Sequence, residues 1–304
     1  MRRVLCCLTA AAVLAGCTDA MPAQRPTAVP THRVNPVSSP PPARTPEPLA
    51  TRHRRPRRHP TPTAATSTDP TSSPSPTPSH TAAPPPPPTV LLNPGHNGGN
   101  STHPAEIARL VPSGYGREKA CDTVGTVTDA GYPEHAFNWN VALRVAGILR
   151  AHAVRVVFTR HTDHGVGPCV NRRAAIGNHP WVAAVVSIHA DGAPASDHGF
   201  HVIQDSRRPQ GATRRVARRS RQLGTDIHAA LVRSSGLVPA TYIGQDGYNY
   251  RDDLAGLNLA RRPATFLELG NMKNRHDAAL QSSPRGRHRI AVAIAAGILT
   301  FLGS

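Results

Sequence analysis

Four side chains with metal-binding or acid–base chemistry stand far apart in the chain. Glu268 follows the apolar run 264–267 and precedes Gly270. A carboxylate in such a run costs several kcal/mol unless it has a partner or a task. His96, Glu134 and His189 precede it, and successive members of the set are 38, 55 and 79 residues apart. Two imidazoles and a carboxylate are a known catalytic zinc set, with a fourth position left for water.

The chemistry of such a set is hydrolysis. Zinc lowers the pKa of a bound water and polarises a carbonyl, while a second carboxylate that is not a ligand moves the proton. Glu268 suits that second part because Phe266 and Leu267 give it an apolar setting, which raises a carboxyl pKa. Simpler explanations stay open: this chain has 17 His, and Glu134 at a helix start could serve the helix dipole alone.

The elements that would position these residues alternate between strand and helix. Apolar runs predict strands at 89–92, 154–159, 183–188 and 264–269, and an antiparallel edge strand at 200–203. Periodic stripes predict helices from Glu134 to about 149, and at 169–178, 213–233 and 289–302. Residues 100–133 and 242–258 read as loops. This alternation predicts an α/β fold with a mainly parallel sheet. Its ligands would gather at the carboxyl ends of the strands, where His96, His189 and Glu268 fall.

Composition divides the chain into three parts. Residues 1–17 have a basic start, a short apolar run and a small-residue ending before Cys17, which is typical of a secretory signal and resembles the bacterial lipoprotein box, with Cys17 lipidated. An ordinary cleaved signal is the alternative. Residues 18–88 are rich in Pro, Thr and Ser and predict a disordered, extended linker with a basic cluster at 52–58. Residues 89–304 would form the folded catalytic domain.

The net charge of +17 points to an anionic neighbour. Nucleic acid, a membrane surface and an anionic polymer are the candidates, although Arg richness with almost no Lys also fits coding bias. Few aromatics for base stacking and an export signal argue against nucleic acid. The run 290–302 is too short to span a bilayer and reads as core.

Four ordered motifs resemble one enzyme family. They are Asn-Pro-Gly-His at 93–96, Glu134 at a helix start, Ser-Ile-His-Ala-Asp at 187–191, and Leu-Glu-Leu-Gly-Asn-Met-Lys-Asn at 267–274. Together they look like the zinc-dependent N-acetylmuramoyl-L-alanine amidases with a type 3 amidase domain. The resemblance implies one Zn²⁺ per chain held by His96, Glu134 and His189, with Glu268 as the catalytic acid/base. It implies hydrolysis of the amide between the muramoyl lactyl group and L-alanine of peptidoglycan. The implied fold is a twisted, mixed sheet of about six strands with helices on both faces.

Two positions qualify the resemblance. Asn93 replaces the usual Asp; if that Asp orients the first His, an Asn carbonyl can still accept a hydrogen bond, more weakly. Glu118 is a rival third ligand because it also precedes the helix. Substrate contacts are harder to predict, and Asn97, the loop 244–247 and Arg251 are more often turn or surface residues.

Cysteine use fits an exported protein. Cys6 and Cys7 would leave with the signal and Cys17 would take the lipid, so an even pair, Cys121 and Cys169, remains for one disulfide. Such a bond matches a disulfide-bearing branch of the family, whereas two unpaired buried thiols are the alternative. We therefore expect a monomeric, lipid-anchored envelope enzyme acting on peptidoglycan. A wall-binding lipoprotein that has lost activity remains the second hypothesis.

Overall fold

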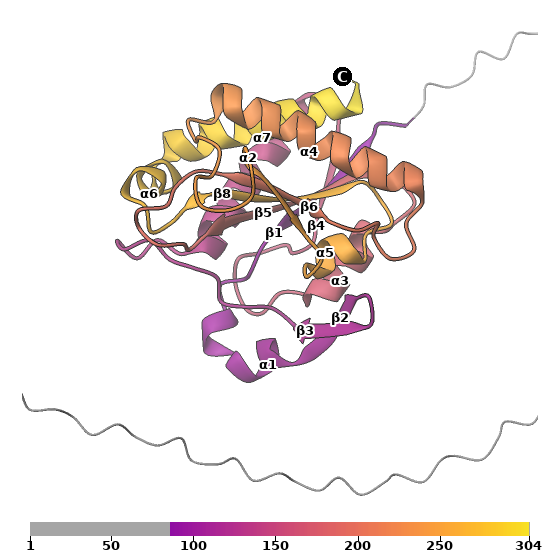
Figure 1. Cartoon of the computed structure of the whole chain (residues 1–304), viewed down its shortest axis with the longest axis horizontal. Coiled ribbons are helices and arrows are strands. Elements are labelled where there is room, and N and C mark those ends of the chain that lie inside the picture. The colour runs from indigo at the N-terminus through magenta and orange to yellow at the C-terminus, as the bar shows by residue number, and fades with distance from the viewer. Residues whose placement is uncertain (1–85, 304) are drawn as a thin grey trace, which may run out of the picture. The chain divides into compact units, whose positions relative to one another are not determined.

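A computed structural model describes residues 86–303, which contain one six-stranded mixed sheet and a small two-stranded one (Figure 1). The strand order of the large sheet is β4-β1-β5-β8-β6-β7. Strands β4, β1, β5 and β8 are parallel to one another, whereas β6 is antiparallel to β8 and parallel to β7. The large-sheet strands are β1 (Thr89–Pro94), β4 (Arg155–Phe158), β5 (Val182–Asp191), β6 (His201–Asp205), β7 (Tyr248–Arg251) and β8 (Ala264–Asn271).

Helices cover both faces of this sheet, which confirms the predicted α/β class. On one face lie α2 (Glu134–Ala151), α4 (Arg214–Ser234) and α7 (Pro284–Leu302); on the other lie the short helices α3 (Val170–Gly177) and α5 (Ala255–Asn258) (Figure 1). Successive residues of β1 show why both faces need cover: Val90 and Leu92 join the large core under α2 and α7, and Leu91 joins the smaller core on the opposite side. Strands buried on both faces read as continuous apolar runs.

The strand register brings the predicted site residues to the same end of the sheet, where the parallel strands have their carboxyl ends. Asn93 of β1 pairs with Ser187 of β5, and His189 of β5 pairs with Glu268 of β8. His96 follows β1 by two residues, at the same end of the sheet. The parallel part of the sheet therefore aligns the ends of three strands that are remote in sequence.

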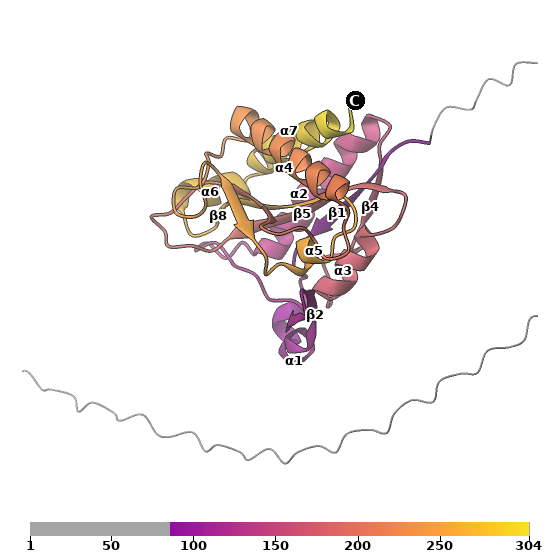
Figure 2. The same cartoon turned by 45° about the vertical axis from the view of Figure 1, so that its right-hand side comes forward.

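Residues 100–133 are more structured than the predicted loop. They hold a 3₁₀ turn (Asn100–Thr102), α1 (Pro104–Ala108) and an antiparallel hairpin of β2 (Leu110–Gly114) and β3 (Arg117–Ala120). Both views place α1 and β2 on the side of the sheet away from α4 and α7 (Figures 1 and 2). The hairpin strands are short, and only Val111 is a buried large apolar residue among them, because β2 otherwise buries Ser113 and Gly114 and β3 buries none; the sequence therefore carries no apolar alternation that would mark them.

Three other predictions were wrong in detail. The strand at 200–203 is β6, which is not at the sheet edge because β7 pairs outside it, within the segment predicted as a loop. Helix α6 (Arg275–Ser282) was missed, because its polar composition gives no clear apolar stripe. Helix α7 begins at Pro284 rather than 289, where Ser283 Oγ accepts the Gly286 N–H and caps a polar first turn.

Among the described residues, no helix has both the length and the apolar character needed to cross a membrane. The predicted signal, the Cys17 lipidation site and the linker with its basic cluster, apart from residues 86–88, lie outside the described residues.

Candidate metal centre

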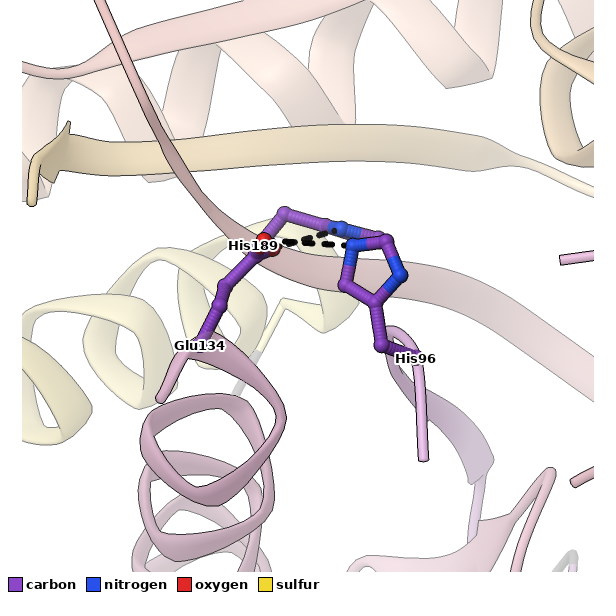
Figure 3. Close-up of side chains that lie close together, drawn as sticks. All are labelled: His96, Glu134 and His189. Atoms are coloured by element: carbon purple, nitrogen blue, oxygen red, sulfur yellow. Dashed lines mark hydrogen bonds and ion pairs between the residues drawn. The ribbon is translucent and has the colours of Figure 1, made fainter. Parts of the chain in front are cut away.

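Three side chains from three separate elements converge at the carboxyl ends of β1 and β5. His96 lies in the loop after β1, Glu134 opens α2, and His189 lies near the end of β5. His96 Nε2 is 3.2 Å from Glu134 Oε2, and His189 Nδ1 is 3.0 Å from Glu134 Oε1. Figure 3 shows both rings turned toward the one carboxylate. One potential ligand atom from each side chain lies within 4.8 Å of the other two.

The donor set and its spacing fit a zinc ion. Zinc in proteins takes imidazole nitrogen and carboxylate oxygen at about 2.0–2.1 Å, which places two tetrahedral ligands roughly 3.3 Å apart. The nitrogen–oxygen separations of 3.2 and 3.0 Å are close to that value. Three protein ligands also leave one position for water, as in catalytic zinc sites.

Two glycines leave the space that these side chains occupy. A Cβ on Gly95 would lie 1.9 Å from His189 Cε1, and a Cβ on Gly125 would lie 2.7 Å from Glu134 Oε2. Gly125 also has φ +83°, a conformation that glycine adopts without steric cost. Any larger residue at either position would push a ligand side chain out of place.

The backbone and ring of His96 are held by a second layer of polar groups. His96 has φ 57°, a conformation that costs a non-glycine residue of order 1–3 kcal/mol and needs support from its surroundings. Its Nδ1 lies 2.9 Å from Thr123 O and 3.3 Å from Asp122 Oδ1. Arg173 Nη2 donates to Asp122 Oδ2 and to His96 O. A proton on Nδ1 would donate to Thr123 O, which leaves Nε2 free as a ligand.

Electrostatics favour one charged imidazole at this carboxylate when no cation is present. Burial lowers the pKa of His96, but Glu134 and Asp122 outweigh it and raise the pKa to about 10. Burial likewise lowers the pKa of His189, and there it prevails over the opposing effect of Glu134, partly because the charge on His96 adds to it. Burial alone would raise the pKa of Glu134, but the two imidazoles hold it well below its ordinary value. The anionic carboxylate that a metal requires is therefore already favoured.

Glu268 stands beside the three residues but is not one of the cluster. It lines a pocket of about 240 Å³ together with His96, His189 and Phe266. Its Oε2 is buried and has no hydrogen-bond partner among the described residues. Burial, followed by the negative charges of Glu134 and Asp191, raises the pKa of Glu268 well above its ordinary value. A buried carboxyl oxygen left unpaired at a pocket wall is available to a substrate or a water.

Asn93 does not orient His96. Its Nδ2 donates to Ser187 Oγ, and its Oδ1 accepts from Thr159 Oγ1 and Arg173 Nη1. The amide therefore ties β1 to β5 and α3, and none of these contacts is a hydrogen bond to the His96 ring. Glu118, the rival ligand, is exposed on β3 and stands outside the three-residue cluster.

Of the possible substrate-contact residues named from the sequence, Arg251 lines the pocket, and Asn97 and the loop 244–247 do not. Arg251 lines the pocket and forms a two-armed ion pair with Asp253, at 2.8 and 2.6 Å. Asn97 is engaged by the backbone, because its Nδ2 donates to His164 O and Gly165 O. The loop 244–247 does not line this pocket.

A disulfide bond adjoins the residues that contact His96. Cys121 and Cys169 are bonded, with their Cα atoms 4.4 Å apart and a sequence separation of 48. Cys121 precedes Asp122 and Thr123, which contact His96, and Cys169 is the N-cap of α3, which carries Arg173. The bond thus joins the two segments that hold the ring of His96.

Sequence reasoning missed the residues of that supporting layer. Asp122 and Arg173 form a buried ion pair at 3.0 Å, with side chains about 5 % and 4 % exposed. Nothing in their spacing relates them to His96. Asp122 comes from a predicted loop, and Arg173 comes from a predicted helix to which no part in the site was assigned. The adjacency of Asp122 to Cys121 was the one available signal.

Comparison with known proteins agrees with this fold. The family model described as N-acetylmuramoyl-L-alanine amidase matches residues 90–300. N-acetylmuramoyl-L-alanine amidase Rv3717 of Mycobacterium tuberculosis is 45 % identical over 231 residues, which cover 74 % of this chain and 91 % of that protein.

Two solved structures are similar at the same level. The amidase Ami1 of Mycobacterium smegmatis is 47 % identical with a TM-score of 0.66, covering 71 % of this chain and 97 % of that one. The apo form of Ami1 from Mycobacterium abscessus is 46 % identical with a TM-score of 0.65, covering 71 % and 98 %. The chain belongs to the N-acetylmuramoyl-L-alanine amidase family.

Proposed function

We propose that this protein is a zinc-dependent amidase that hydrolyses the bond between the muramoyl lactyl group and L-alanine of peptidoglycan. The single observation that carries the proposal is the meeting of His96, Glu134 and His189 beside Glu268, whose Oε2 has no hydrogen-bond partner among the described residues. Family membership and relatives named as amidases supply the substrate class.

Each residue has a part in that reaction. His96, Glu134 and His189 would hold the zinc, and Asp122 and Thr123 would fix the first imidazole from behind. When bound, zinc would lower the pKa of a coordinated water and polarise the lactyl carbonyl. Glu268 would accept a proton from the attacking water and return it to the amine of the departing L-alanine. Phe266 lines the same pocket and gives Glu268 an apolar neighbour.

Replacing Glu268 by Gln tests the assignment directly. The amide keeps the shape of the side chain but cannot accept the proton, so we expect hydrolysis of a muramoyl peptide to fall by about 10²–10⁴-fold. Zinc content, measured by atomic emission, should stay at one ion per chain because Glu268 is not in the cluster. His189→Ala is the matched variant and should lose both zinc and activity. Full activity in the Gln variant would remove Glu268 from the mechanism.

We also infer that the enzyme acts from a lipid tether in the cell envelope. The support is the signal-like segment at 1–17 that ends in Cys17, followed by a Pro-rich spacer long enough to cross part of a wall. Growth with a labelled fatty acid should label the wild-type chain, whereas Cys17→Ser should be unlabelled and released into the medium. A labelled Cys17→Ser chain would contradict the assignment.

A further inference from the structure

Five arginines surround a second hollow, which we name the arginine cleft. Arg207 and Arg208 follow β6, and Arg214, Arg218 and Arg221 belong to α4; all five line one cavity of about 580 Å³. All five are exposed. The only acid in the lining is Asp205, whose two oxygens already accept the Tyr115 hydroxyl and the Arg207 backbone N–H.

The positive charges of the arginine cleft repel one another. Arg214 lies in the first turn of α4, where the helix dipole disfavours a cation, and that turn contains no acid. Arg218 and Arg221 follow at spacings of four and three residues, so three like charges share one helix face. A cluster of this kind is relieved by an anion that neutralises several charges together.

Residues 86–303 supply little of that neutralisation. Arg207 Nη1 is 3.5 Å from Asp252 Oδ2, in an exposed pair. None of the other four guanidinium groups forms an ion pair with a carboxylate of residues 86–303. Four arginines therefore keep their fork-shaped donor faces available to a ligand.

The arginine cleft is separate from the metal centre. Strand β6 begins at His201, which pairs with Glu268, and ends at Asp205 in the lining of the cleft. Because β6 runs antiparallel to β8, the cleft lies toward the opposite end of the sheet from the carboxyl ends that carry the metal ligands. No residue lines both hollows.

We propose that the arginine cleft binds a flexible anionic polymer whose repeating charges are phosphodiesters. Arginine pairs with phosphate oxygens through two parallel hydrogen bonds, which suits repeated phosphates. The cationic groups border a hollow from two directions, the loop after β6 and the side of α4, so they can enclose a chain. A membrane, which is flat, would contact a flat or convex protein surface more readily than a hollow. No aromatic side chain lines the cleft for base stacking, which disfavours single-stranded nucleic acid.

Titration calorimetry of the full chain with poly(glycerol phosphate) tests this site. We expect binding by the wild type that weakens as salt rises, and binding at least about tenfold weaker for Arg218→Gln/Arg221→Gln, because each lost charge-assisted hydrogen bond removes roughly a factor of ten. The control is Arg275→Gln/Arg285→Gln, which removes the same charge from exposed positions on α6 and α7. Every variant keeps the basic cluster at 52–58, so the difference reports on the cleft.

Three results would overturn the proposal. They are no measurable binding at low salt, equal weakening in both double variants, and binding confined to vesicles that contain phosphatidylglycerol with none to the soluble polymer. The last would identify a membrane contact instead. Thermal unfolding without polymer separates loss of the site from loss of the fold, because the cleft variant should unfold at the same or a higher temperature once its like-charge repulsion is removed. A lower unfolding temperature would contradict the electrostatic argument.

Discussion

At the scale of single residues, one carboxylate organises the metal centre. Glu134 presents one oxygen to each imidazole, and Asn138 and the Ala190 N–H donate to its Oε1 as well. The Thr126 N–H donates to Oε2, so five neighbours fix a side chain that is only 3 % exposed. A ligand held this firmly loses little freedom when an ion enters, so the site is prepared for binding before the metal arrives.

Gly95 is the residue whose change should damage the site most selectively. In Gly95→Ala the new Cβ would overlap the His189 ring, so the imidazole must rotate away from Glu134. We expect zinc affinity to fall by at least tenfold, in line with the effect of disturbing groups around a metal, as measured by competition with a chromophoric chelator. Gly147→Ala in α2 is the control, since its Cβ would meet nothing within 4 Å. Equal zinc affinity in both variants would show that His189 is not held through Gly95.

The pH dependence of the reaction should report on Asp191. Burial, then Glu134, then Asp191 raise the pKa of Glu268, so the base form of Glu268 appears only at higher pH. Asp191→Asn removes one negative neighbour and lowers that pKa, and the acidic limb of the kcat/KM profile should move to lower pH. Asp129→Asn removes the same charge from an exposed surface position and should leave the limb in place. A limb that moves to higher pH in Asp191→Asn would contradict this.

At the scale of elements, the disulfide and the Asp122–Arg173 ion pair connect the hairpin segment to α3. Reducing the bond, or replacing both cysteines by Ser, should lower the free energy of unfolding by about 2–5 kcal/mol, measured by urea denaturation. Zinc affinity should fall as well, because Asp122 and Thr123 lose an anchor one residue away. Adding reductant to the double-Ser variant is the control and should change nothing. Unchanged zinc affinity would mean that the Asp122–Arg173 ion pair alone is enough to hold Asp122 and Thr123 against His96.

The elements that sequence predicted well are those with strong periodicity. The four parallel strands and helices α2, α3 and α4 were placed within a few residues, because their apolar spacing is enforced by burial on one or two faces. Strand β7 has four residues and a mixed burial pattern, and the hairpin strands bury few apolar side chains, so local sequence carries little sign of either. The convergence of His96, Glu134 and His189 could be predicted because the carboxyl ends of parallel strands lie together at one end of the sheet. The groups behind His96 could not, because they depend on tertiary contacts between a loop and α3.

At the scale of the whole molecule, the site and the core are separate. The ligands come from the loop after β1, the start of α2 and the end of β5, so the centre forms only when the sheet is complete. The main core lies under α2, α4 and α7 and includes fully buried residues such as Phe137, Leu231 and Ile294. Because apolar burial supplies most of the stability of a domain, folding should not require the metal.

Metal removal should therefore lower the thermal stability without unfolding the domain. A ligand at about a thousandfold its Kd stabilises the folded state by about 4 kcal/mol, which for a domain of this size corresponds to a drop of roughly 10 °C on chelation. Far-UV circular dichroism at room temperature should stay unchanged, because the imidazoles still hydrogen-bond to Glu134. Glu268→Gln should show the same zinc-dependent shift, and His189→Ala should show none. Loss of the far-UV signal on chelation would make the metal part of the fold, and a full shift in His189→Ala would place the ion elsewhere.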